Sequence, residues 1–155
     1  MIAQSSVAND PLTRLDGAAY GELMTRAVEQ PLVNGFNLAM AGEQIEFCWF
    51  PTSGLISIIA LDADGDEAEV GMIGREGIVN LPVVLGDDCS ALRVMVQVGG
   101  SAIRVEANAV RAVSPTIARP GRYSSPAPRF SPFRWRHRRS PMRAMPSTSA
   151  SPGGS

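Results

Sequence analysis

The 155-residue chain contains no lysine, and its only histidine, His137, lies near the C-terminus. Residues 1–113 therefore lack the side chains that most often act as general bases, and they offer no imidazole ligand to a metal ion. The two cysteines, Cys48 and Cys89, do not have the spacing of a zinc site or of a disulfide framework. We therefore expect no enzymatic activity, no bound metal, and two reduced and partly buried thiols.

Long apolar runs are also missing. None approaches the roughly 20 residues that a membrane-spanning helix needs. The first ten residues lack the basic and apolar regions of a secretory signal. We therefore expect a cytoplasmic protein that has no membrane partner.

Charge is unevenly distributed, although the formal net charge is only −1. Residues 1–113 hold all 15 acidic residues against six arginines, which gives a net charge of −9. Residues 114–155 hold the other eight arginines, no acidic residue and eight of the 12 prolines, which gives a net charge of +8. Because such a composition sustains neither helix nor strand, we expect a folded domain over residues 12–113 and a disordered Arg/Pro/Ser-rich tail over 114–155.

Within the folded part, the apolar pattern changes from helical to strand-like. Apolar residues recur every three or four positions between Leu15 and Val28, which predicts a short amphipathic helix capped by Asp16. Short apolar runs separated by turn residues follow, and they predict strands over 36–40, 45–50, 55–61, 68–73, 78–85, 93–98 and 102–105. Residues 107–113 are expected to begin a closing helix. This order is typical of a mainly β protein built as an antiparallel double-sheet roll or barrel.

Two local motifs invite a ligand interpretation. The acidic segment 62–66 does not have the glycine and glutamate spacing of a calcium loop, and its Asp-Gly step instead predicts a hairpin turn. Gly71, Gly74 and Gly77 recur every third residue, but no lysine accompanies them and strand-like sequence follows. They therefore favour a tight turn at a corner of the roll over a phosphate-binding loop.

Two segments carry a resemblance to a known family. Residues 50–57 (FPTSGLIS) and 64–79 (DGDEAEVGMIGREGIV) closely resemble the sensor domain of Crp/Fnr-family bacterial transcription regulators. Segments 42–45, 94–98 and 107–115 continue the match, so the resemblance covers roughly residues 12–117. It implies a cyclic-nucleotide-binding-like double-stranded β-helix, or jelly roll, with a short N-terminal helix. In this family the roll senses a small-molecule effector, and a dimerisation helix and a helix-turn-helix DNA-binding domain follow it in a homodimer.

The resemblance also implies a ligand pocket inside the roll. The family pocket would be lined here by Gly71, Gly74, Glu76, Asn80, Leu81 and Arg93. Cyclic-AMP binders of the family place a glutamate on the ribose and an arginine on the cyclic phosphate. Val79-Asn80-Leu81 stands at the first of these motifs, and the second falls near Ser90, with Arg93 as the closest arginine. Because a buried phosphate without a fixed cation is costly, these departures disfavour cyclic AMP, and the effector stays unidentified.

No other cofactor is expected. Two cysteines are too few for a four-cysteine iron–sulfur cluster, and the folded part has no histidine for haem. A cyclic nucleotide, although disfavoured, is the one bound cofactor that stays possible.

The match ends near Ile117, where the family would continue with a long helix. Reading the codons of residues 142–155 one nucleotide out of phase is compatible with a helical sequence like the family's next segment. We therefore hypothesise that residues after about 117–124 are translated from a shifted frame, so that the chain is a truncated regulator without its DNA-binding domain. The nucleotide sequence of the gene tests this hypothesis.

A second function class depends on the tail itself. Its arginines could contact phosphates, and its aromatic residues could stack on bases; these are Phe130, Phe133, Trp135 and His137. The alternative function is therefore non-specific nucleic-acid binding through the basic C-terminal tail.

Overall fold

The computed structural model describes residues 2–62 and 65–117. The elements in chain order are η1 (Gln4–Ser6), α1 (Asp10–Thr13), α2 (Gly17–Met24), β1 (Ala27–Leu32), β2 (Asn37–Ala39), β3 (Phe47–Pro51), β4 (Leu55–Leu61), β5 (Glu67–Ile73), α3 (Pro82–Leu85), β6 (Arg93–Val98), β7 (Gly100–Glu106) and α4 (Ala107–Ile117). The hypotheses about residues 118–155, namely disorder, a shifted frame and nucleic-acid binding, lie outside the described residues.

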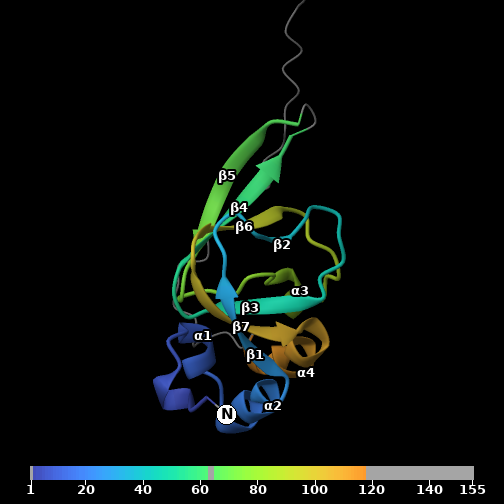
Figure 1. Cartoon of the computed structure of the whole chain (residues 1–155). Helices are drawn as coiled ribbons and strands as arrows, with labels where there is room; N and C mark the ends of the chain where they lie inside the picture. The colour runs from blue at the N-terminus through green and yellow to red at the C-terminus, as the bar shows by residue number, and fades with distance from the viewer. Residues whose placement is uncertain (1, 63–64, 118–155) are drawn as a thin grey trace, which may run out of the picture. The chain divides into compact units, whose positions relative to one another are not determined.

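Two antiparallel sheets form the body of the fold. One sheet has the order β1-β7-β3 and the other has the order β2-β6-β4-β5 (Figure 1). The hairpin of β4 and β5 pairs Ile56 with Ile73 at its base and Leu61 with Glu67 near its tip, and it projects beyond the rest of the second sheet. The expected mainly β jelly roll is therefore confirmed, as is the hairpin at the acidic segment.

The N-terminal helix is shorter than the apolar pattern predicts. Asp16 is its N-cap, and its carboxylate accepts a hydrogen bond from the Ala19 amide at 2.8 Å, as expected. The helix ends at Met24, and Val28 belongs instead to β1, which pairs along β7. Sequence reasoning misses β1 because Glu29 and Pro31 interrupt its apolar pattern.

The strand predicted over residues 78–85 is wrong. Val79 makes only an isolated bridge to Trp49 of β3, and the chain then turns into the short helix α3. Asn80 adopts a left-handed backbone conformation with φ of 66°, which ends any extended run, and Pro82 lies at the start of α3. Residues 78–85 therefore form a turn and a short helix, because the backbone conformations of Asn80 and Pro82 do not fit an extended strand.

Two hydrophobic cores lie on opposite faces of the β1-β7-β3 sheet. The helix-side core joins this sheet to the helices and contains Leu12, Leu23, Cys48, Phe50, Ile103, Val105 and Val110 among others. The inter-sheet core lies between the two sheets and contains Leu32, Trp49, Ile56, Val79, Val94, Val96 and Ala102. Successive residues of β3 alternate between them, since side chains of a strand point to opposite faces.

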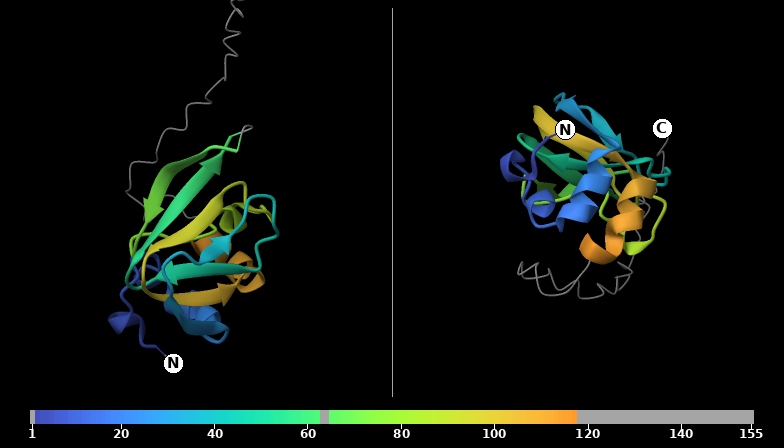
Figure 2. Two further views of the ribbon diagram at one scale, coloured as in Figure 1. Left: turned by 45° about the horizontal axis from the view of Figure 1, so that its top comes forward. Right: turned by 90° about the horizontal axis from the view of Figure 1, so that it is seen from below.

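Helix α4 closes the helix-side core. It lies beside α2, as the view from below shows (Figure 2), and it buries Val110 and Val113. The helix continues through Pro115 to Ile117, so the domain boundary expected at residue 113 falls inside it. Across residues 2–62 and 65–117, no helix combines the length and the apolar character that crossing a membrane demands.

The two cysteines lie in different environments. Cys48 is fully buried in the helix-side core, and burial raises the pKa of its thiol to about 12. Cys89 is exposed, so the expectation of burial holds for Cys48 and is wrong for Cys89.

This difference predicts selective labelling. Because the thiolate is the reactive species, a thiol-specific reagent at pH 8 should modify one equivalent rapidly and the second only after denaturation. With a reagent that releases a chromophore when it reacts with a thiol, the absorbance of that chromophore measures both phases. Cys89→Ser should remove the rapid phase alone, and a rapid phase that survives this substitution would contradict the burial of Cys48.

Candidate functional site

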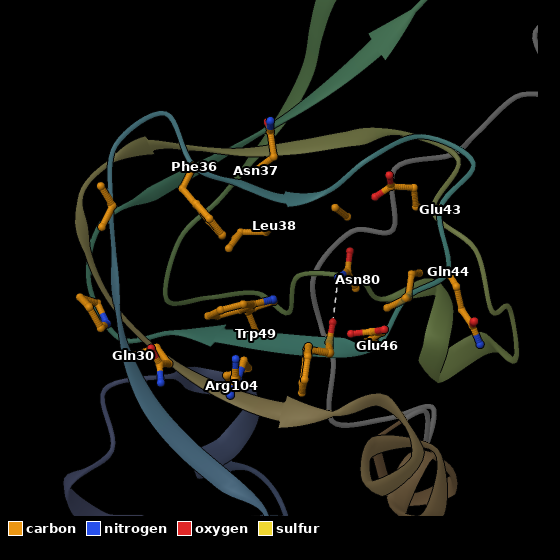
Figure 3. Close-up of a pocket in the computed structure, with 15 residues that line it drawn as sticks. Gln30, Phe36, Asn37, Leu38, Glu43, Gln44, Glu46, Trp49, Asn80 and Arg104 are labelled. Atoms are coloured by element: carbon orange, nitrogen blue, oxygen red, sulfur yellow. Dashed lines mark hydrogen bonds between the residues drawn. The ribbon is translucent and has the colours of Figure 1, made fainter.

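A cavity of about 750 Å³ opens between the two sheets. It is lined by residues of β1, β2, β3 and β7, by the segment 43–46, and by Asn80 from the turn before α3 (Figure 3). Its apolar walls include Phe36, Leu38 and Trp49, and its polar groups include Gln30, Glu43, Glu46 and Arg104. The cavity has the mixed apolar and polar lining that is typical of small-molecule sites.

Arg104 supplies the cationic group of the cavity. It lies on β7 between Ile103 and Val105, whose side chains are buried in the opposite, helix-side core. Its guanidinium carbon lies 4.3 Å from the centroid of the Phe47 ring and 5.8 Å from that of Trp49. A guanidinium stacked on an aromatic ring keeps its in-plane N–H groups available for an anion.

Those N–H groups are not taken up by any protein group among residues 2–62 and 65–117. Within the part of the chain that the structure describes, Arg104 has no hydrogen-bond or ion-pair partner, whereas Arg26, Arg93 and Arg111 each pair with a carboxylate. Arg104 is therefore a half-buried cation that is held in place by ring contacts and is ready for an anionic partner.

Asn80 contributes a second unsatisfied group. The residue is 94% buried, and its Nδ2 donates a hydrogen bond to the Phe47 carbonyl at 2.8 Å. Its Oδ1 is buried without any hydrogen-bond partner among the described residues. Figure 3 shows the amide at the wall of the cavity, above β3, with its hydrogen bond running down to that strand. Leaving a buried acceptor unpaired costs about 1–3 kcal/mol, so a donor from a bound molecule would be favourable here.

Of the six residues that the resemblance places in a ligand pocket, the structure brings only Asn80 to this cavity. Gly71 lies within β5 opposite Ile58, and the Gly74 amide donates to the Glu76 carboxylate at 2.7 Å within the turn after β5. Leu81 is exposed on the surface.

Arg93 lies on β6, where its guanidinium pairs with Glu67 and its Nε donates to the Asn37 side chain at 3.1 Å. Its charge is therefore already compensated, unlike that of Arg104. A joint role of all six residues in ligand binding stays a prediction.

Sequence reasoning missed Arg104, Phe47 and Trp49. The signal that could have found them is a single arginine inside the apolar run 102–105, because a lone charge in a buried strand usually has a function or a partner. Recognising the site also needs the strand register, which pairs Arg104 with Trp49 across β7 and β3.

The cavity wall is directly connected to α4. The amides of Gly42 and Ile45 donate to the carbonyls of Ser90 and Asp88, each at 2.7 Å, and the first amide of α4 donates to the Glu46 carbonyl at 2.8 Å. Arg111 of α4 pairs with Asp88. Segment 42–46 therefore links the cavity to α4 through backbone hydrogen bonds.

No family model matches the sequence, and no curated protein matches it. Solved structures do match. The regulatory subunit of a cAMP-independent protein kinase A from Trypanosoma brucei, in a mutant form bound to cAMP in its A site, matches at 16% identity and a TM-score of 0.64. That match covers 74% of this chain and 44% of the kinase subunit, so the chain spans less than half of the subunit's length.

Two bacterial regulators also match. The c-di-GMP-responsive global regulator CLP of Xanthomonas campestris has 15% identity and a TM-score of 0.54, over 65% of this chain and 49% of CLP. The sensor domain of the transcriptional regulator DNR from Pseudomonas aeruginosa has 16% identity and a TM-score of 0.58, over 68% of this chain and 72% of that domain. The chain therefore has the fold of cyclic-nucleotide-binding sensor domains, which Crp/Fnr-type regulators share with the regulatory subunits of protein kinase A.

Proposed function

We propose that residues 2–117 form the effector-sensing domain of a Crp/Fnr-type transcription regulator, and that the cavity between the sheets holds the effector. The observation that carries this proposal is the buried, unpartnered Oδ1 of Asn80, which lines the same cavity as the unpaired guanidinium of Arg104. The buried acceptor without a partner is unfavourable in the empty protein, and a small molecule that pairs with it and with the guanidinium is stabilising.

The sequence supports a transcription regulator more than a kinase subunit. Segments 50–57 and 64–79 resemble the Crp/Fnr sensor domain, and the likeness to CLP and to the DNR sensor domain agrees with that resemblance. For intact members of the family, the proposal implies a homodimer that binds promoter DNA in the cytoplasm. The role is one of binding without catalysis, since residues 1–113 contain neither lysine nor histidine.

Signal transmission would follow the wall of the cavity. Segment 42–46 contacts the effector site on one side and is hydrogen-bonded to residues 88–90 and to Ala107 on the other. A shift of this segment on ligand binding would therefore move the start of α4. In intact regulators of the family such a shift would bias the arrangement of the DNA-binding domains.

A thermal-shift screen tests the effector site. A ligand at 100 times its Kd should raise the free energy of unfolding by about 2.7 kcal/mol and therefore raise the Tm by several degrees. The screen would use the full chain with cyclic nucleotides and a metabolite library. Ala39→Phe should abolish the shift, because Ala39 lines the cavity and a phenyl ring would fill part of it.

Ala112→Phe on the exposed face of α4 is the matched control and should keep the shift. A ligand that stabilises the wild-type chain and A39F equally would bind elsewhere, and this result would contradict the assignment of the cavity.

A further inference from the structure

Resting on the proposed function, we propose that the effector is a singly charged organic anion with a planar ring, whose negative group binds Arg104 and which donates a hydrogen bond to Asn80. The anchor of the ligand is thus a residue of β7 and not the turn of residues 74–77 or Arg93. Four properties of the cavity lead to this ligand class.

The first property is the state of the cation. Arg104 is the only cationic side chain among the described residues that line the cavity, and it is stacked on Phe47. Stacking fixes the plane of the guanidinium, so little side-chain entropy remains to be lost when an anion binds. A carboxylate or phosphate oxygen pair matches the fork of its N–H groups.

The second property is the charge balance. Glu43 and Glu46 also line the cavity, and Figure 3 shows them gathered at one end of it with Gln44. A ligand with several negative charges would be repelled by these carboxylates, whereas one negative charge is matched by Arg104. Because the carboxylates of Glu43 and Glu46 accept hydrogen bonds, this end of the cavity favours N–H or O–H groups on the rest of the ligand.

The third property is the free acceptor. Oδ1 of Asn80 accepts nothing from the described protein, and the Nδ2 of the same amide is already committed to Phe47. The group that meets Asn80 must therefore be an N–H or O–H donor of the ligand.

The fourth property is the aromatic lining. Phe36, just before β2, is 57% exposed, and its ring points across the cavity towards Trp49 of β3 in Figure 3. A flat ring between these two side chains would remove apolar surface from water and allow ring stacking. Two sources carry this chemistry, namely the phosphodiester of a cyclic mononucleotide and the carboxylate of an aromatic acid.

The test uses matched probes from both sources. Cyclic AMP is compared with neutral adenosine, and 4-aminobenzoate with neutral 4-aminobenzamide. Binding is measured by calorimetry and by fluorescence in a Trp135→Phe chain, where Trp49 is the remaining tryptophan of two. In at least one pair the anion should bind at least about tenfold more tightly than its neutral partner, since a charge-assisted hydrogen bond contributes that much.

Arg104→Met isolates the anchor. Methionine keeps an unbranched apolar contact with the rings and removes the charge, so the anion should lose at least about tenfold in affinity and the neutral probe should not change. Arg26→Met is the matched control, because Arg26 pairs with Glu106 on the surface outside the cavity, and it should leave both affinities unchanged.

The donor is tested on the ligand side, which leaves the buried Asn80 intact. If the carboxylate arm binds, benzoate, which lacks the amino group of 4-aminobenzoate, should bind about 3- to 10-fold more weakly. If the phosphodiester arm binds, the same loss is expected for the cyclic phosphate of purine riboside, which lacks the amino group of cyclic AMP.

The outcomes separate this inference from the proposed function. If neither anion binds more tightly than its neutral partner, or if R104M and R26M behave alike, the ligand class is wrong. If a neutral library compound then still changes Trp49 fluorescence, the proposed sensor function stands and only the proposed ligand class fails. If no probe and no library compound changes Trp49 fluorescence or the Tm, both proposals fail.

Discussion

Replacing Phe50 by alanine should lower the free energy of unfolding by about 3–5 kcal/mol. Phe50 lies in β3, is 1% exposed, and contributes one of the largest fully buried side chains of the helix-side core. Truncation removes the transfer free energy of the ring and leaves a cavity that the sheet and the helices cannot close without moving. Because small domains are stable by only about 5–15 kcal/mol, much of the variant should unfold in mild denaturant.

Urea denaturation followed by circular dichroism measures this loss. Phe36→Ala is the matched control, since it removes the same ring from a side chain that is 57% exposed, and it should cost about 1 kcal/mol or less. Equal losses in the two variants would contradict the helix-side core as described.

Gly54→Ala should be the second most damaging change, with an expected loss of about 2–4 kcal/mol. Gly54 lies in the turn between β3 and β4 with φ of 86°, and a Cβ there would lie 2.6 Å from the Val98 carbonyl oxygen. A Cβ on Gly100 would in turn lie 2.5 Å from the Ser53 carbonyl. The two turns therefore contact each other backbone to backbone, and no flexible side chain can move aside.

Gly35→Ala separates the two causes of this loss. Gly35 has nearly the same φ, 81°, but a Cβ there would meet nothing within 4 Å. It should therefore report only the cost of a left-handed conformation, about 1–2 kcal/mol. Thermal and urea denaturation of both variants give the difference. Similar losses for Gly54→Ala and Gly35→Ala would show that the close approach of the turns contributes nothing.

Much of the fold could be predicted where local chemistry and tertiary structure agree. Asp16 caps a helix, β4 and β5 pair as a hairpin around the acidic segment, and the apolar runs at 55–61 and 93–98 form β4 and β6. Prediction fails where tertiary pairing overrides the pattern. Strand β1 forms against β7 despite the Glu29 charge and Pro31, and residues 78–85 turn because of Asn80 and Pro82.

The site could be predicted only in part. The family resemblance directs attention to residues 71–93, and Asn80 of that segment does reach the cavity. Arg104 lies outside the segment, and its importance depends on cross-strand neighbours. Register pairs it with Trp49 and brings its guanidinium over Phe47, and no spacing in the sequence encodes that contact.

Strand β3 separates two compartments of different character. Phe47 and Trp49 line the cavity, which is open to solvent, while Cys48 and Phe50 are buried in the helix-side core. A single layer of backbone lies between them, so the cavity cannot widen on the β3 side without pressing this strand into closely packed side chains. Because such packing has low compressibility, the stiffness of the helix-side core limits how far the cavity can expand. The size of molecule that the cavity admits is therefore set partly by residues that no ligand touches.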